Sequence, residues 1–176
     1  MMRLHLNNSI LIILFCHISL TSLSQDRRVS AGYYNKGEVK FNSAHYEEAI
    51  LYFTKAIEAD SSNYHAWIRR GFSKANLKDF DGEMNDYTAV IERAPGHIWA
   101  YISRGSAKNR RNDYKSAIDD FNKAIAIDPK EPEAYNNRGF AKKFLGDFEG
   151  ACDDWVKSKR LGNSEAKVIL KNNHCK

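Results

Sequence analysis

The sequence predicts an all-α protein made of four helix pairs of equal length. The chain of 176 residues has only 3 prolines and little Val or Thr beside Ala, Lys and Asn, a balance that favours helix over strand. Aromatic residues and glycines recur together at one constant interval without any insertion. A fixed period of about 20–50 residues is the signature of a repeat protein, in which each repeat is one supersecondary unit. The recurring glycines are Gly37, Gly71, Gly105 and Gly139.

Residues 1–24 differ in character from the rest of the chain. Arg3 stands near the start without an acidic neighbour, the apolar run 9–20 comes next, and small polar residues lead to Gln25. This order of a charged start, a short apolar stretch and a small-residue exit predicts a secretory signal peptide over residues 1–24. An uncleaved anchor is the alternative, although the apolar run is shorter than the roughly 20 residues of a transmembrane helix. We expect export to the periplasm or the outside, with only peripheral membrane association.

Residues 30–165 divide into four frames of equal length, and each frame predicts one helical hairpin. Apolar residues or glycine at positions 4 and 8, and then mostly apolar residues at 17, 20, 21, 24, 27 and 28, follow the spacings of three and four typical of amphipathic helices. Polar turns separate the two halves, and Pro95 and Pro129 close the second and third frames, because proline cannot continue a helix. The frames are 30–63, 64–97, 98–131 and 132–165.

Small residues at two positions of the frame predict close packing within each hairpin. Position 8 is always glycine, and position 20 is Ala49, Ala117 or Ala151 in three frames but Glu83 in the second. Contact side chains set the distance between packed helices, so small ones bring the helix axes together. Position 24 has a large aromatic residue in every frame: Phe53, Tyr87, Phe121 and Trp155.

A final helix is expected at residues 164–174. The last frame ends at Leu161–Gly162, a glycine helix stop, and Ser164 is a candidate N-cap for the final helix. Ala166, Ile169 and Leu170 then share one face. Repeat proteins need a terminal cap with a polar outer face, and we expect this helix to be that cap.

The repeat resembles the tetratricopeptide repeat family, in an exported bacterial form. That family has an aromatic residue at position 4, Leu-Gly at 7 and 8, Ala at 20 and 27, an aromatic at 24 and Pro at 32, and this chain matches most of these in four copies. The resemblance implies an α-solenoid, a right-handed superhelix of stacked hairpins with a concave groove. This chain departs from the pattern at position 7, which is Lys36 in the first frame and Arg in the others.

The basic residues of position 7 vary together with an acidic column. The three frames with Arg at position 7 have Asp at position 23, whereas the first frame has Lys36 and Tyr52. We expect each Arg to meet an Asp of its own or the preceding repeat through charge-assisted bonds. The alternative is a solvated charged edge, which contributes little to stability. The residues concerned are Arg70, Arg104 and Arg138, with Asp86, Asp120 and Asp154.

Two further charged features are interpreted as structural. A lysine column at position 11 (Lys40, Lys74, Lys108 and Lys142) is expected to pack its stems and leave its heads in water. Glu83 replaces the small residue of position 20, and the sequence leaves open whether it pairs with Lys74 or Lys78 or marks a loosened second repeat.

The resemblance also implies a partner-binding groove along the first helix of each hairpin. In the family, positions 2, 5, 9, 12 and 13 line it, and Arg110 and Lys143 near its rim would favour an acidic ligand segment. The alternative is that neighbouring first helices bury part of this stripe, especially Ile68, Ile102 and Phe140. The predicted groove residues are Tyr34, Phe41, His65, Ile68, Phe72, Trp99, Ile102, Arg110, Asn136, Phe140, Lys143 and Phe144, and Asn109 lies on the same stripe.

The sequence offers no set of residues for catalysis, for a metal or for a cofactor. His45 and His97 fall in predicted turns, His65 has no nucleophile or acid at useful spacing, and no phosphate-binding glycine loop occurs. A mildly basic exported chain has little access to nucleic acid, so we expect a protein or peptide partner. The alternatives are an accessory subunit packed permanently in an envelope complex, and a small exported enzyme or redox protein that uses a cysteine thiol.

Two cysteines remain after the predicted signal peptide. Cys152 takes an inward position of the last frame, and Cys175 lies beyond the predicted cap helix. In an oxidising compartment a disulfide between them would pin that helix to the last repeat. The alternative is a buried free thiol at Cys152 beside a frayed tail.

Overall fold

The structure is a computed structural model, and it describes the backbone of residues 8–175 and the side chains of residues 23–175. Within these residues the chain forms α-helices and no strand, so the all-α fold class is confirmed. The chain divides into two compact units, Met1–Ser73 and Lys74–Lys176. The helices are α1 (Asn8–Asn42), α2 (Tyr46–Ala59), α3 (Tyr64–Asn76), α4 (Phe80–Arg93), α5 (Ile98–Arg110), α6 (Tyr114–Ile127), α7 (Pro132–Phe144), α8 (Phe148–Arg160) and α9 (Ser164–Asn172).

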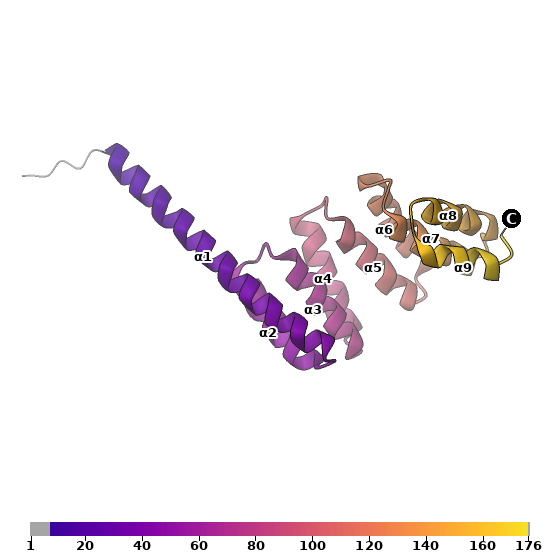
Figure 1. The fold of residues 1–176 in the computed structure, drawn as a ribbon, viewed down its shortest axis with the longest axis horizontal. Coiled ribbons are helices and arrows are strands. Elements are labelled where there is room, and N and C mark those ends of the chain that lie inside the picture. The colour runs from indigo at the N-terminus through magenta and orange to yellow at the C-terminus, as the bar shows by residue number, and fades with distance from the viewer. Residues whose placement is uncertain (1–7, 176) are drawn as a thin grey trace, which may run out of the picture. The chain divides into compact units, whose positions relative to one another are not determined.

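In the first unit, α2 runs back along the C-terminal part of α1 (Figure 1). The two helices approach closely at Gly37, where an added Cβ would lie 2.5 Å from the ring of Phe53. Ser30 donates a hydrogen bond of 2.7 Å to the carbonyl of Ala56 and accepts one of 2.9 Å from the Asn63 amide. These bonds fix α1 against the end of α2 and the turn that leads into α3.

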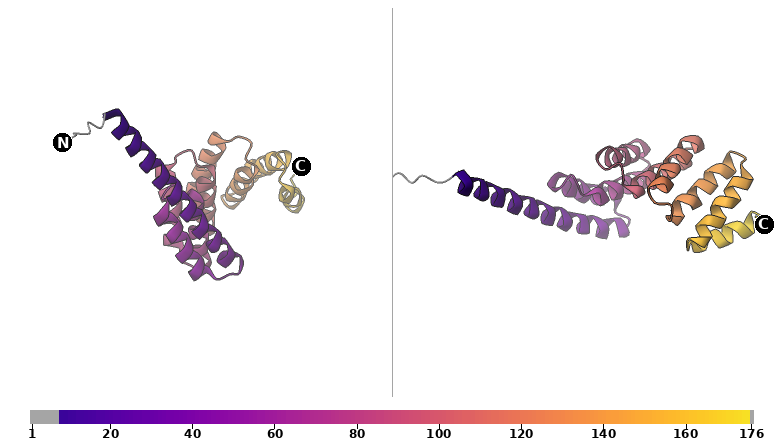
Figure 2. Two further views of the ribbon diagram at one scale, coloured as in Figure 1. Left: turned by 60° about the vertical axis from the view of Figure 1, so that its left-hand side comes forward. Right: turned by 90° about the horizontal axis from the view of Figure 1, so that it is seen from above.

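The second unit repeats this arrangement in the hairpins α5–α6 and α7–α8 (Figure 2). A Cβ on Gly105 would lie 2.7 Å from the ring of Phe121, and one on Gly139 would lie 2.6 Å from Nε1 of Trp155. Each of these aromatic side chains is buried. The glycines are therefore needed because the position-24 ring occupies the space that a side chain would fill.

The turns inside the hairpins share one backbone conformation. The residue two places before each second helix has a positive φ, and these residues are again one repeat period apart: Ala44 (58°), Lys78 (64°), Asn112 (62°) and Gly146 (88°). In α4, α6 and α8 the next residue, an aspartate, is the N-cap and accepts a hydrogen bond from a backbone N–H in the first turn. The capping carboxylate satisfies a backbone donor that would otherwise be unpaired at the start of the helix.

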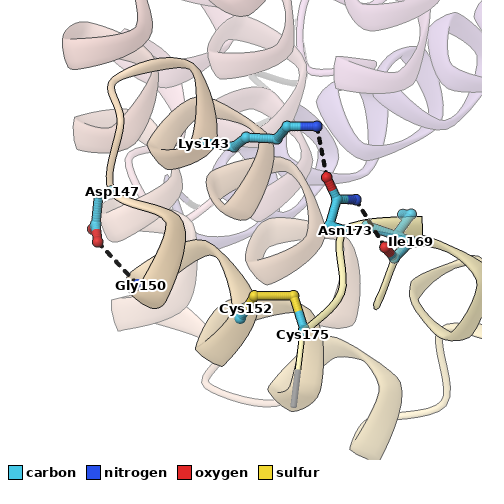
Figure 3. Close-up of a disulfide and its surroundings, with 7 residues drawn as sticks. All are labelled: Lys143, Asp147, Gly150, Cys152, Ile169, Asn173 and Cys175. Carbon is cyan, nitrogen blue, oxygen red and sulfur yellow. Dashed lines mark hydrogen bonds between the residues drawn. A yellow bond between two sulfur atoms is a disulfide. The ribbon is translucent and has the colours of Figure 1, made fainter. Parts of the chain in front are cut away.

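The last helix is tied to the preceding hairpin by covalent and polar contacts. Cys152 in α8 forms a disulfide with Cys175, which lies beyond α9, and their Cα atoms are 5.5 Å apart (Figure 3). Lys143 at the end of α7 donates a hydrogen bond of 2.6 Å to the side-chain oxygen of Asn173. The disulfide is the one that the sequence allowed, and the polar contact to the tail adds a second attachment.

The predicted signal peptide is not tested by the structure. Residues 1–7 lie outside the described residues, and the side chains described begin at residue 23. Among the described residues, no helix combines the length and the hydrophobicity that crossing a membrane requires.

Candidate functional site

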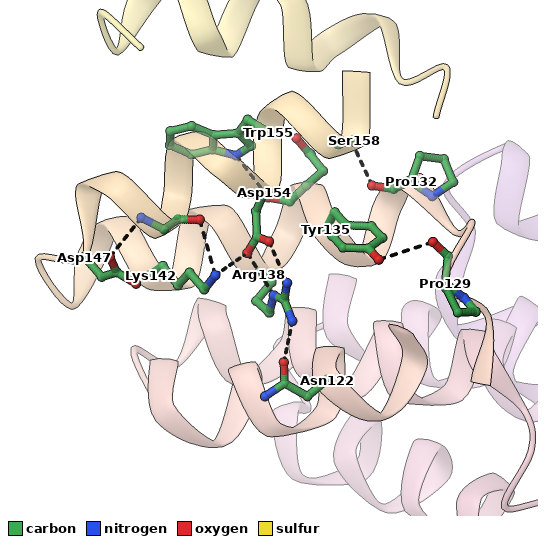
Figure 4. Close-up of polar contacts among 12 residues, drawn as sticks. Asn122, Pro129, Pro132, Tyr135, Arg138, Lys142, Asp147, Asp154, Trp155 and Ser158 are labelled. Atoms are coloured by element: carbon green, nitrogen blue, oxygen red, sulfur yellow. Dashed lines mark hydrogen bonds and ion pairs between the residues drawn. The ribbon is translucent and has the colours of Figure 1, made fainter. Parts of the chain in front are cut away.

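In the third and fourth repeats the Arg of position 7 forms a buried ion-pair network with the Asp of its own repeat, as the last hairpin shows (Figure 4). Arg138 donates from Nε and Nη2 to the two carboxylate oxygens of Asp154, at 2.8 and 2.6 Å. Lys142 completes the network, with its ammonium 2.9 Å from Asp154 Oδ2. Asp154 is only 4% exposed, so its charge is compensated by two cations and not by water.

The third hairpin has the same geometry. Arg104 donates to both oxygens of Asp120, at 3.0 and 2.8 Å, and Lys108 lies 2.7 Å from Asp120 Oδ2. The bond to Asp120 raises the pKa of Arg104, despite its partial burial. In the second repeat the described contact to Asp86 comes from Lys74, at 3.0 Å.

The lysine column was expected to have solvated heads, and this prediction is wrong for three of its members. Lys74, Lys108 and Lys142 each place the ammonium against a buried aspartate and donate to a backbone carbonyl at the start of the second helix. The reason is that positions 7 and 11 are one helical turn apart and face the same aspartate. The sequence contained a signal for this pairing, because the Lys of position 11 and the Asp of position 23 recur with the same period.

The position-7 Arg also joins consecutive repeats. Nη1 of Arg138 donates to Asn122 at 2.6 Å, and Nη1 of Arg104 donates to Thr88 at 3.3 Å. In the first unit Arg70 makes the corresponding bond of 3.0 Å to Thr54. Each of these partners stands at position 25 of the preceding repeat, so the guanidinium bonds both its own hairpin and the one before it. The recurring basic residue is thus architectural, a part of the packing between repeats.

Glu83, whose role the sequence left open, has a partner that was not among those expected. It is 1% exposed, accepts a hydrogen bond of 3.1 Å from the Tyr87 hydroxyl and forms an ion pair with Arg110. Burial, together with the adjacent Glu83 charge, raises the pKa of Tyr87 well above its usual value. Arg110 is therefore engaged within the protein, although it was predicted to stand at the rim of the groove and attract an acidic segment.

Several predicted groove residues are part of the packing. Ile68 and Ile102 are buried, and Ile102 belongs to one core cluster with Ala134 of the neighbouring first helix α7, as the alternative expected. Phe140 packs edge-on against Trp155, with ring centroids 5.4 Å apart. The Lys143 ammonium donates a hydrogen bond to the side-chain oxygen of Asn173. For Ile68 and Ile102 the groove prediction is corrected, because a position on the predicted stripe does not guarantee that the side chain reaches solvent, whereas Phe140 and Lys143 are half-buried.

In the first unit two of the predicted groove residues, Tyr34 and Phe41, make aromatic or cation–π contacts with neighbouring side chains. Tyr34 lies between Phe53 and His65, with ring centroids 5.7 and 6.5 Å away. Phe41 packs edge-on against Tyr46 and carries the Arg69 guanidinium 5.1 Å above its ring. His65 is exposed, whereas Phe72 is half-buried.

In the second unit two predicted groove residues expose large aromatic surfaces. Trp99, in the first turn of α5, is 45% exposed, and Phe144, at the end of α7, is 63% exposed. Phe144 stacks on Tyr114 of the neighbouring hairpin, with ring centroids 4.9 Å apart and an interplanar angle of 8°. The ring contact fixes the orientation of Phe144 while its other face stays open.

A set of amides joins α5 and α7, the helices that carry these aromatic residues. Asn109 donates to the carbonyl of Asn137, and the Asn137 amide donates to the Ser106 hydroxyl, each at 3.2 Å. The side-chain oxygens of Asn109 and Asn136 are buried and accept no hydrogen bond within the described part of the protein. Buried acceptors without a donor are costly, so each such oxygen needs a donor that the described residues do not supply, such as a water molecule or a ligand.

Asn136 also lines a pocket of about 370 Å³ at the start of α7 and the turn that precedes α9. Asn136, Asn137, Glu133, Asn163 and Glu165 are among the lining residues. Glu133 occupies position 2 of the fourth frame, a groove position that was not among the predicted residues. Among the described residues, no group of three or more His, Cys, Asp or Glu side chains is arranged to hold a metal ion.

Comparison with family models finds tetratricopeptide repeats at two places in the chain. A model described as a tetratricopeptide repeat matches residues 30–63, and one described as a TPR repeat matches residues 105–146. Comparison with curated proteins gives no match. The two matched segments thus carry this repeat.

Solved structures with the same fold are similar in architecture and distant in sequence. A thermophilic TPR protein of Thermus thermophilus, TTC0263, is 14% identical with a TM-score of 0.73, over 82% of this chain and 81% of that one. YrrB, described as a TPR protein with an unusual peptide-binding site, is 19% identical with a TM-score of 0.67, over 81% and 74%. The first TPR domain of Spaghetti (RPAP3), solved with an HSP90 peptide, is 24% identical with a TM-score of 0.63, over 68% and 95%. These likenesses show the all-α solenoid fold.

Proposed function

We propose that this chain, which contains tetratricopeptide repeats, is a non-enzymatic interaction module that binds an extended peptide segment along the α5 and α7 face of its second unit. The observation that carries the proposal is the pair of buried amide oxygens on Asn109 and Asn136 that have no donor within the described residues. An extended peptide presents backbone N–H groups at regular intervals, and these are the donors that such acceptors lack.

The exposed aromatic residues supply the apolar part of the same surface. Trp99 stands at the start of α5 and Phe144 at the end of α7, and both rings are open to solvent. Aromatic side chains are common anchors of binding energy, since they bury a large area at little entropic cost. Two apolar anchors together with amide acceptors suit a segment that presents apolar side chains and main-chain donors.

Similar folds support a binding role. The RPAP3 domain was solved with a peptide, and YrrB is described by its peptide-binding site. The permanent-subunit alternative would require a surface that is covered in every state. The exposed rings and unpaired oxygens are compatible with it, and reversible binding of a free peptide is the property that separates the two functions.

We also propose that the chain is exported, with residues 1–24 as its signal peptide. The Cys152–Cys175 disulfide supports this location, because structural disulfides persist in oxidising compartments. The same bond engages both cysteines that lie beyond the signal segment, which leaves neither of them as a free thiol for the redox or enzymatic alternative. Determination of the N-terminal residue of the protein recovered from its native host tests the proposal, and an intact Met1 would contradict it.

Binding is tested by selecting peptides from a random phage-displayed library on the purified chain. The selected peptides are synthesised and titrated by fluorescence anisotropy against the wild type, Trp99→Ala and Phe144→Ala. Each substitution is expected to weaken binding about tenfold or more, as for an anchor residue. Val168→Ala on the exposed face of α9 is the matched control and should bind normally. Selected peptides whose affinity is the same for all variants would refute the proposed surface.

A further inference from the structure

We propose that the pocket at the start of α7 binds the ammonium or guanidinium head of a lysine or arginine in the bound segment. The inference rests on the proposed function and specifies the chemistry of its partner: a basic side chain at this end of the surface. This preference is opposite in sign to the acidic ligand segment that Arg110 and Lys143 were expected to favour. The pocket volume of about 370 Å³ is ample for such a head group.

The first support is the charge of the lining. Glu133 and Glu165 both border the pocket, and neither a lysine nor an arginine is among its lining residues. Within the described chain, neither carboxylate takes part in an ion pair, whereas Asp120 and Asp154 are each compensated by two cations. Glu133 and Glu165 thus present uncompensated negative charge to any group that enters the pocket.

The second support is independent of the acidic residues. Asn136 is 5% exposed, borders the pocket, and has a side-chain oxygen that accepts no hydrogen bond within the described residues. A carbonyl oxygen can only accept, so a ligand that pairs with it must present N–H or O–H groups. An ammonium has three such donors and a guanidinium five, and either can satisfy this oxygen and a carboxylate together.

The helix N-termini at the pocket do not turn it into an anion site. Glu131 accepts from the backbone N–H of Glu133 at 3.1 Å, and Asn163 accepts from those of Glu165 and Ala166 at 2.9 and 3.2 Å. These caps already occupy N–H groups that would otherwise face an anion. The charge of the pocket is therefore set by the carboxylates of Glu133 and Glu165.

The titration behaviour of Glu133 agrees with this charge balance. Its pKa is raised above the usual value, first by burial and then by the charges of Glu131 and Glu165. The hydrogen bond to Asn137 opposes this rise in pKa and is the smallest contribution. A cation in the pocket would relieve the repulsion between the carboxylates.

An organic cation fits the pocket better than a metal ion. Two carboxylates and one amide oxygen fall short of the six to eight oxygen ligands that calcium takes. Hydrogen-bond donors on a flexible side chain can reach the three acceptors without a complete coordination sphere.

The test is an NMR titration of the isotope-labelled full chain with N-acetyl-lysine methylamide and N-acetyl-arginine methylamide as probes. The amide signals of Gly162 and Ser164 and the side-chain amide of Asn136 are followed. The uncharged N-acetyl-norleucine methylamide is the matched control for the stem, and calcium chloride is a separate arm. We expect saturable shifts with the two basic probes, and affinity at least about tenfold weaker in the double variant Glu133→Gln, Glu165→Gln.

Glu149→Gln is the matched control variant, because this exposed glutamate lies in the first turn of α8, at the opposite end of the hairpin from the pocket. It should bind the probes as the wild type does. Equal shifts with the norleucine compound, unchanged affinity in the double variant, or saturation by calcium with displacement of the lysine probe would each overturn the inference. Selected peptides that bind through Trp99 but ignore the glutamate substitutions would refute the pocket while leaving the proposed function intact. Loss of Trp99 dependence would refute the function instead.

Discussion

Substitution of Gly139 by alanine tests the packing that underlies the repeat. The new Cβ would lie 2.6 Å from Nε1 and 2.9 Å from Cδ1 of Trp155, which is closer than packed atoms approach. The ring cannot simply move aside, because it is 1% exposed and its N–H donates to the Asn136 carbonyl at 3.2 Å. The substitution must therefore displace the ring or separate α7 from α8.

The expected change in the free energy of unfolding combines three effects. Overpacking of a filled core costs about 1–3 kcal/mol. Loss or weakening of the Trp155 hydrogen bond costs about 1 kcal/mol more. Alanine is a better helix former than glycine by about 1 kcal/mol, which offsets part of the loss. We expect Gly139→Ala to destabilise the protein by about 1–3 kcal/mol.

Gly32 provides the control for the effect of helix propensity. It lies within α1, and an added Cβ there would meet nothing within 4 Å, so Gly32→Ala should be neutral or stabilise by up to about 1 kcal/mol. Both variants are compared with the wild type by urea unfolding, followed by far-UV circular dichroism and tryptophan fluorescence. An increase in stability for Gly139→Ala as large as that for Gly32→Ala would refute the packing argument.

Three further predictions concern the second unit. Asp154→Asn should cost about 3 kcal/mol in urea unfolding, since it leaves two cations without their buried partner, whereas the exposed neighbour Asp153→Asn should change stability by less than about 0.5 kcal/mol; equal effects would contradict the network. Reduction of the Cys152–Cys175 disulfide should lower stability by about 3 kcal/mol for its sequence separation of 23, and Cys175→Ala should reproduce the loss and abolish the response to reductant. Because the pKa of Glu133 is raised, its ionisation opposes folding: the penalty is absent below its unfolded pKa and complete above its folded pKa. Glu133→Gln should therefore match the wild type in stability near about pH 3 and exceed it near about pH 7, and a pKa at or below the usual value by carbon-detected NMR would contradict this.

The predicted groove residues show which properties of a side chain follow from its position in the family repeat and which do not. Trp99 and Ile102 stand on the same predicted stripe, yet the first is exposed and the second is buried. Arg110 was expected at an open rim, but Glu83 lies against it and compensates its charge. Helical periodicity places a side chain on a face, whereas its exposure depends on the neighbour that packs there.

The sequence by itself determined the repeat, the helices and the need for glycine at position 8, because these depend on the helical spacings and on the constant repeat period within one chain. It also revealed that the Arg and Asp columns vary together. Only the tertiary structure decided that Lys142 shares Asp154 with Arg138, that Arg138 also bonds Asn122 of the preceding repeat, and that Asn136 has an unpaired oxygen beside Glu133. The physical reason is that a polar group's partner is set by distances between residues remote in sequence, which periodicity does not contain.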